Sequence, residues 1–99
     1  MRGWHVALVE SAKSDKRDYL GMAYALTVLN VRASVIVDGR KDRLISFEMR
    51  GNRFRGDISA GDWIEVDPKD VAKGHVKRAI NLSTSSEVTA KSSPFGGAG

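Results

Sequence analysis

The chain has 99 residues, of which 41% are hydrophobic and 28% charged, and a net charge of +4. This length supports one small domain, and the absence of cysteine excludes a disulfide framework and a thiolate zinc site. No apolar run approaches the roughly 20 residues of a membrane span, and the start of the chain is too weakly apolar for a secretory signal. The sequence therefore predicts a cytoplasmic protein.

The N-terminal third of the chain is ambiguous. Residues 4–10, WHVALVE, indicate either an additional strand or a segment packed by Trp4. Residues 15–31 carry apolar side chains at helical spacing, but they also alternate large and small side chains. We favour a strand over residues 22–30, because Gly21 disfavours a helix interior.

A β-hairpin follows. Residues 33–38 are rich in β-branched side chains, GRKD supplies a turn, and residues 43–50 alternate with a period of two. In the second strand Ile45, Phe47 and Met49 share one face, so we expect them to point into the core.

Three glycines interrupt residues 51–62, which predicts a loop pinned to the core by Phe54 and Ile58. A strand is expected over 62–67, with Ile64 and Val66 inward and Pro68 ending it. The side chains predicted to share one core are Ile45, Phe47, Met49, Ile64 and Val66.

The remainder of the chain predicts a connector, a last strand over 75–82, and a disordered tail over 84–99, where small polar residues and glycine dominate. The domain organisation expected is an N-terminal segment at 1–20 packed on the barrel, a β domain at 21–83, and this tail.

Five short strands with glycine turns favour an all-β fold, namely a small five-stranded OB-fold-like barrel. The segments FEMRGNRFRGDISAGDWIEV and VKRAINLSTSSEV resemble an OB-fold-like module of poorly characterised bacterial proteins, over roughly residues 21–88. The pattern that carries the resemblance combines EMRG, GDWIEV and NLST. OB-folds often bind single-stranded nucleic acid or oligosaccharide. Because residues 51–62 are too short and glycine-rich for the usual plug, the barrel-capping helix is expected to be short or absent.

The positive charge is concentrated in one segment. Residues 40–55 carry six bases and two acids, so the rest of the chain has no net charge. Guanidinium groups suit phosphates, and exposed aromatics stack on bases. The predicted nucleic-acid-binding residues are Arg40, Lys41, Arg43, Arg50, Arg53, Arg55 and Trp63.

Three alternatives to this assignment stay open. The basic residues form two clusters, one of Arg40, Lys41 and Arg43 and one of Arg50, Arg53 and Arg55, and these could lie at opposite ends of the barrel. Arg50 could pair with Glu48 or Glu65, and Trp63 could cover a barrel end. His5 and His75 are far apart and lack a carboxylate cluster, so no metal site is expected.

No phosphate loop, nucleophile elbow or paired-carboxylate motif is present in the sequence. We therefore expect a protein that is not an enzyme and needs no cofactor. It is expected to bind nucleic acid through residues 40–55 with low sequence specificity, and single strands more than duplexes. The alternative is a protein–protein interaction or structural module of a larger assembly, which the aromatic content of only 7% favours.

Overall fold

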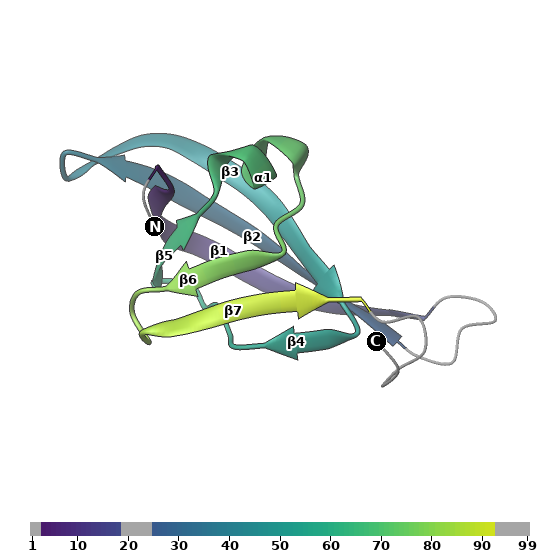
Figure 1. Cartoon of the computed structure of the whole chain (residues 1–99). Coiled ribbons are helices and arrows are strands. Elements are labelled where there is room, and N and C mark those ends of the chain that lie inside the picture. Colours follow the sequence, from purple (N-terminus) through teal and green to yellow (C-terminus); the bar gives the residue numbers. More distant parts are fainter. Residues whose placement is uncertain (1–2, 19–24, 93–99) are drawn as a thin grey trace.

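The computed structural model describes residues 3–18 and 25–92, which form seven strands and one short helix (Figure 1). In chain order the elements are β1 (His5–Asp18), β2 (Ala25–Val37), β3 (Arg40–Gly51), β4 (Arg53–Arg55), β5 (Trp63–Val66), α1 (Pro68–Lys73), β6 (Arg78–Asn81) and β7 (Ser86–Lys91). The strands make one antiparallel sheet with the order β3-β2-β1-β5-β6-β7-β4. No helix among the described residues is long and apolar enough to cross a membrane.

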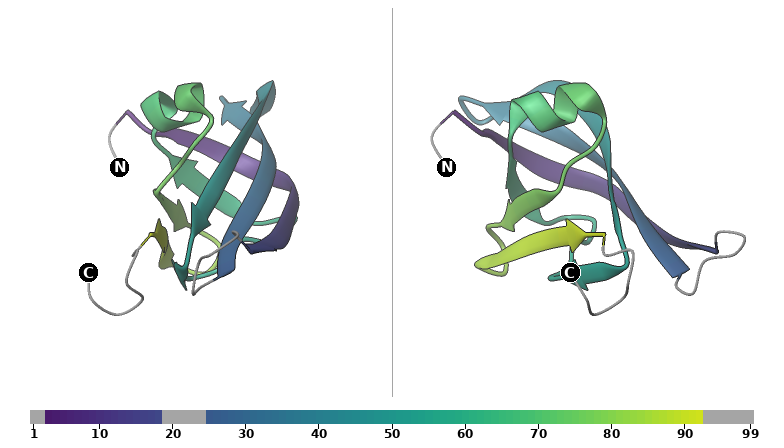
Figure 2. Two further views of the ribbon diagram at one scale, coloured as in Figure 1. Left: turned by 90° about the vertical axis from the view of Figure 1, so that its right-hand side faces the viewer. Right: turned by 45° about the vertical axis from the view of Figure 1, so that its right-hand side comes forward.

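The sheet is strongly curled, and the reason lies in its connectivity. β3 and β4 stand at opposite ends of the strand order, yet only Asn52 separates them in the chain. Six interstrand steps of about 4.8 Å would place the two edges roughly 29 Å apart in a flat sheet. Two Cα–Cα steps span at most about 7.6 Å. The sheet must therefore bend until its first and last strands meet, as Figure 2 shows.

A glycine permits the close approach where the edges meet. Gly51 is buried at the end of β3, and a side chain at this position would run into the backbone of Lys91 on β7. β3 and β4 are nevertheless not paired with each other in the sheet. The all-β fold class is thus confirmed, whereas the closed five-stranded barrel is wrong, because the sheet is open and has seven strands.

Two of the expected strands are one. Segments 22–30 and 33–38 were separated in the prediction, but β2 runs from Ala25 to Val37 without a break, and residues 22–24 lie outside the described residues. Its antiparallel pairing with β3 confirms the predicted hairpin. The N-terminal region is no peripheral segment, since β1 pairs with β2 on one side and with β5 on the other.

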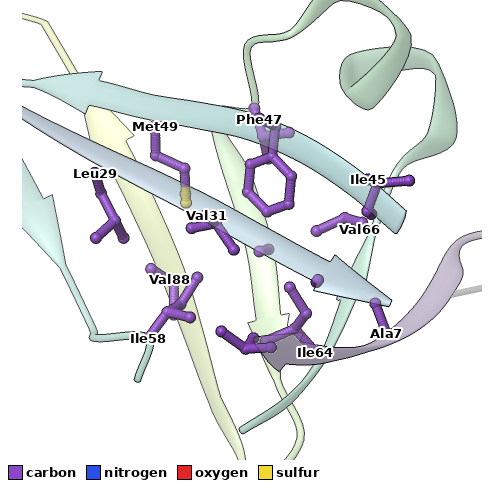
Figure 3. Packing of buried hydrophobic residues seen from close by; sticks show 14 of the residues in the cluster. Ala7, Leu29, Val31, Ile45, Phe47, Met49, Ile58, Ile64, Val66 and Val88 are labelled. Atoms are coloured by element: carbon purple, nitrogen blue, oxygen red, sulfur yellow. The ribbon is translucent and has the colours of Figure 1, made fainter. Parts of the chain in front are cut away.

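The core lies inside the curl, between the long strands β1–β3 and the short strands β6 and β7 (Figures 1 and 2). The predicted core is confirmed: Ile45, Phe47 and Met49 from β3 face Ile64 and Val66 from β5 (Figure 3), and all five are buried. Ile58 is also buried and Phe54 packs against the cluster, as expected for the residues that pin the 51–62 segment.

The C-terminal prediction is wrong for residues 86–91. They form β7, in which Val88 and Ala90 are buried in the core, while residues 93–99 lie outside the described residues. Alternation places these two side chains inward, and the pairing of β7 with both β6 and β4 satisfies its backbone. The tail is therefore, in its described part, an integral strand of the sheet.

The connector after β5 contains the helix α1. The Asp67 carboxylate accepts a hydrogen bond from the Lys69 amide at 2.9 Å, Pro68 occupies the first turn, and Gly74 ends the helix with φ 77°. Val71 packs against the core. The segment after β5 was expected to be a connector without a helix, and no helix forms at 51–62; Pro68 follows the end of β5 as predicted.

Candidate functional site

The two predicted basic clusters lie at opposite ends of β3. Arg40, Lys41 and Arg43 follow the β2–β3 turn, whereas Arg50 is at the other end of the strand, next to β4. Ten residues at about 3.3 Å per residue separate Arg40 from Arg50 by roughly 33 Å. The cleft that contains Arg50 includes none of Arg40, Lys41 and Arg43, which we call the turn cluster.

Members of the turn cluster have partners on neighbouring strands. Lys41 Nζ lies 3.0 Å from Glu10 Oε2, to which Ser34 Oγ also donates a hydrogen bond at 2.9 Å. The hydrogen bond from Lys41, with that from Ser34, lowers the pKa of Glu10. Arg43 Nη2 lies 2.8 Å from His5 Nε2. Lys41 and Arg43 thus connect the β2–β3 hairpin to β1, which is a structural role.

A basic cleft of about 850 Å³ lies at the other end of β3. Its lining includes five cationic side chains and one carboxylate, that of Glu87. We call it the cationic cleft; its charged or titratable lining residues are Arg50, Arg55, His75, Lys77, Arg78, Glu87 and Lys91. Arg50 and Arg55 were predicted from the sequence, and the structure brings them together with three cations that were not.

The register of the short strands aligns part of this lining. Arg78 on β6 and Arg55 on β4 are both paired with Thr89 on β7, and Lys91 is paired with Arg53. Residues directly opposite in antiparallel strands project to the same face. One outward face of β6, β7 and β4 therefore carries a row of basic side chains, with Arg53 adjacent to the cleft lining.

Residues 74–77, between α1 and β6, run beside β3 and form another wall of the cleft. Glu48 on β3 donates its amide to the Gly74 carbonyl at 3.0 Å and accepts at its own carbonyl from the Val76 amide at 2.9 Å, a short parallel bridge that holds His75 against β3. Lys77 immediately precedes β6. His75 Nε2 is buried and, within the described part of the chain, has no hydrogen-bond partner.

Two of the five cations in the cleft are paired with carboxylates. Arg50 Nη1 lies 3.5 Å from Glu48 Oε1, one of the pairings that the sequence left open, and Arg78 Nε donates to Glu87 Oε2 at 2.6 Å. All four side chains are partly exposed, so these ion pairs contribute little to stability. Within residues 3–18 and 25–92, Arg55, Lys77 and Lys91 make no ion pair. These three are the cations best placed to receive an external anion.

The two tryptophans differ in their relation to the cleft. Trp63 is 40% exposed on β5, beside Leu82, and is not part of the cleft lining. Trp4 precedes β1 and is half-buried, with the Arg78 guanidinium carbon 5.9 Å from its ring centroid. The aromatic residue next to the cleft is therefore Trp4, which the sequence reading treated only as a packing residue.

Sequence reasoning missed Lys77, Arg78 and Lys91 because it counted charge along the chain. Outside residues 40–55 bases and acids balance, but folding separates them in space. The sequence did not mark Arg78 as exposed, because the apolar residues Ile80 and Leu82 share its phase; the structure instead buries Ala79 and Asn81. Lys91 could not be placed on a strand face either, because residues 84–99 were expected to be disordered.

Comparison of the chain with protein-family models, with curated proteins and with solved structures found no match. The resemblance to an OB-fold-like module accordingly stays a prediction that rests on the sequence pattern alone.

Proposed function

We propose that this chain is a non-enzymatic nucleic-acid-binding domain that holds a phosphate backbone in the cationic cleft. The observation that supports the proposal is the set of five cations around one concave site, of which Arg55, Lys77 and Lys91 lack an ion pair within the described residues. Phosphate groups that these side chains contact release condensed counterions, which favours binding at low salt. Contacts to phosphate carry no base information, so low sequence specificity follows.

The test removes the three unpaired cations together. Changing Arg55, Lys77 and Lys91 to alanine is expected to lower the salt slope of binding to a single-stranded oligonucleotide by about 2, at about 0.7 per lost phosphate contact. The measurement is a fluorescence-anisotropy titration between about 20 and 300 mM salt. The three side chains are exposed, so the melting temperature should change little.

The control removes the same charge from the opposite end of β3. Changing Arg40, Lys41 and Arg43 to alanine lowers the net charge equally, so it accounts for any effect of total charge. We expect this variant to keep the slope of the unchanged protein. Equal losses in both variants would mean diffuse attraction rather than a site, and no salt-dependent binding by the unchanged protein to any oligonucleotide would overturn the proposal.

A protein-interaction module is the second candidate, supported by a different surface. Four large hydrophobic side chains in the described residues are at least 40% exposed, and two of them, Trp63 and Leu82, are neighbours joined by a backbone hydrogen bond of 2.7 Å. Apolar patches of this kind are typical of protein contacts. A chain that binds no nucleic acid at low ionic strength would leave this function as the better one.

A further inference from the structure

Arg78 is held in place by two partners, Glu87 on β7 and Trp4, which precedes β1. Its Nε donates to Glu87 Oε2 on β7 at 2.6 Å, and its guanidinium carbon lies 5.9 Å from the centroid of the Trp4 ring. The second distance is within the range of a cation–π interaction. An exposed arginine normally loses considerable rotamer entropy when it binds a ligand. Here part of that ordering has already occurred in the folded protein.

The restrained guanidinium belongs to the cationic cleft. Arg78 lines it together with Arg55 and Lys77, and its side chain remains 46% exposed. A guanidinium is planar and stacks on flat π-systems as well as binding phosphate, whereas a lysine ammonium is a point charge. The cleft therefore offers a flat, partly exposed surface next to the cations that would hold the backbone.

We propose that Arg78, backed by Trp4, is a base-stacking residue of the cleft and that its ligand is a single-stranded nucleic acid. This inference rests on the proposed function and adds to it the class of ligand. Unpaired bases stack on guanidinium planes and aromatic rings. In a duplex the base faces already stack on one another, so a platform of this kind selects single strands.

Fluorescence separates the two tryptophans. The chain has only Trp4 and Trp63, so the Trp63→Phe variant reports on Trp4 alone and the Trp4→Phe variant reports on Trp63 alone. A thymidine oligonucleotide is expected to quench Trp4 emission and to leave Trp63 emission unchanged, because only Trp4 lies beside Arg78. Binding seen by anisotropy without any change at Trp4 would overturn the stacking role.

Arg78→Lys is the decisive substitution because it keeps the charge and removes the plane. The unchanged protein should bind a thymidine oligonucleotide roughly 5- to 150-fold more tightly than an abasic strand of equal length and charge, the range for stacking of one base. The variant should bind both strands equally, with an unaltered salt slope. A variant that only loses folding would instead lose both ligands and its melting transition.

The outcomes distinguish the two proposals. Equal binding of thymidine and abasic strands by the unchanged protein, or equal binding of a duplex, would overturn the stacking platform and leave backbone binding intact. Failure of all these strands to bind at low salt would overturn the proposed function itself. Loss of the thymidine preference in Arg78→Lys, with binding of both strands retained, is the result that the stacking proposal requires.

Discussion

At the scale of single residues, Asn81 ties together two segments that carry no regular structure. Its Nδ2 donates to the Asp57 carbonyl and to Asp62 Oδ2, both at 2.9 Å, and its Oδ1 accepts from the Ser83 and Thr84 amides at 3.0 and 3.2 Å. Asn81 is fully buried at the end of β6. A buried amide with both donors and its acceptor satisfied fixes the loop before β5 and the β6–β7 turn at once.

Asn81→Asp is therefore expected to destabilise the fold at pH 7 by at least about 2–3 kcal/mol. The new carboxylate loses both donors and faces the Asp62 carboxylate, which raises its pKa in the folded state above the value in the unfolded chain. Folding then favours its protonated form, so this cost should shrink as the pH falls through the folded pKa.

Urea denaturation at pH 7 and pH 4, with Asn81→Ala measured in parallel, checks this expectation. The alanine variant has no titrating group at this position, so its difference from the unchanged protein should vary much less with pH. A constant stability difference between Asp and Asn at the two pH values would contradict the arrangement of the network.

At the scale of elements, β7 shows that a strand made of polar and small residues is difficult to predict from the sequence. Its outward residues are polar, and its inward residues Val88 and Ala90 are few and small, so its hydrophobic signal is weak. Pairing with β6 and β4 supplies what the side chains lack, because the strand closes two backbone ladders. β7 is buried because the strand order places it between β6 and β4, and this long-range pairing cannot be read from the local sequence.

Val88→Ala should destabilise the protein by about 2 kcal/mol, since it leaves a cavity in the packed core. Val37→Ala is the matched control, because the same two methyl groups are removed from a side chain that is 50% exposed at the end of β2. Thermal denaturation of both variants makes the comparison. Equal melting temperatures would restore the prediction of a disordered tail.

Strands with several large alternating apolar side chains were predicted well, whereas strands with few or small buried side chains were not. Ile45, Phe47 and Met49 alternate with polar neighbours, so β3 was evident from the sequence. The second half of β1 is exposed at residues 13–16 and persists through its ladder with β2. The gap left between the expected strands 22–30 and 33–38 includes Arg32, which is exposed between buried Val31 and Ala33 within the continuous β2.

At the scale of the whole molecule, the curl of the sheet assembles the site. The cationic cleft takes residues from β3, β4, β6, β7 and the segment after α1, and Asn52 keeps β3 and β4 together. Two of the five cations of the cleft, Arg50 and Arg55, were accessible from the sequence because they lie within one segment. The remaining cations depend on the strand order, which brings distant segments to one surface.

Insertion of two glycines after Asn52 should disturb the geometry of the cleft more than it lowers the stability of the fold. A longer link costs only about 0.6 kcal/mol per doubling of its length, but it lets β4 move relative to β3. We expect weaker oligonucleotide binding with a small change in melting temperature. The same insertion after Gly39, in the distant β2–β3 turn, serves as the control and should leave affinity unaltered.

The central position of β1 has a consequence for synthesis of the chain. β1 ends at Asp18, whereas β5, which covers its second edge, begins 45 residues later at Trp63. At about 5–20 residues per second, translation needs several seconds to cross that interval. Meanwhile β1–β2–β3 can form a local meander with an open backbone edge, a template for pairing with other chains. The greatest danger of aggregation for this protein thus falls during its own production, before β5 has emerged.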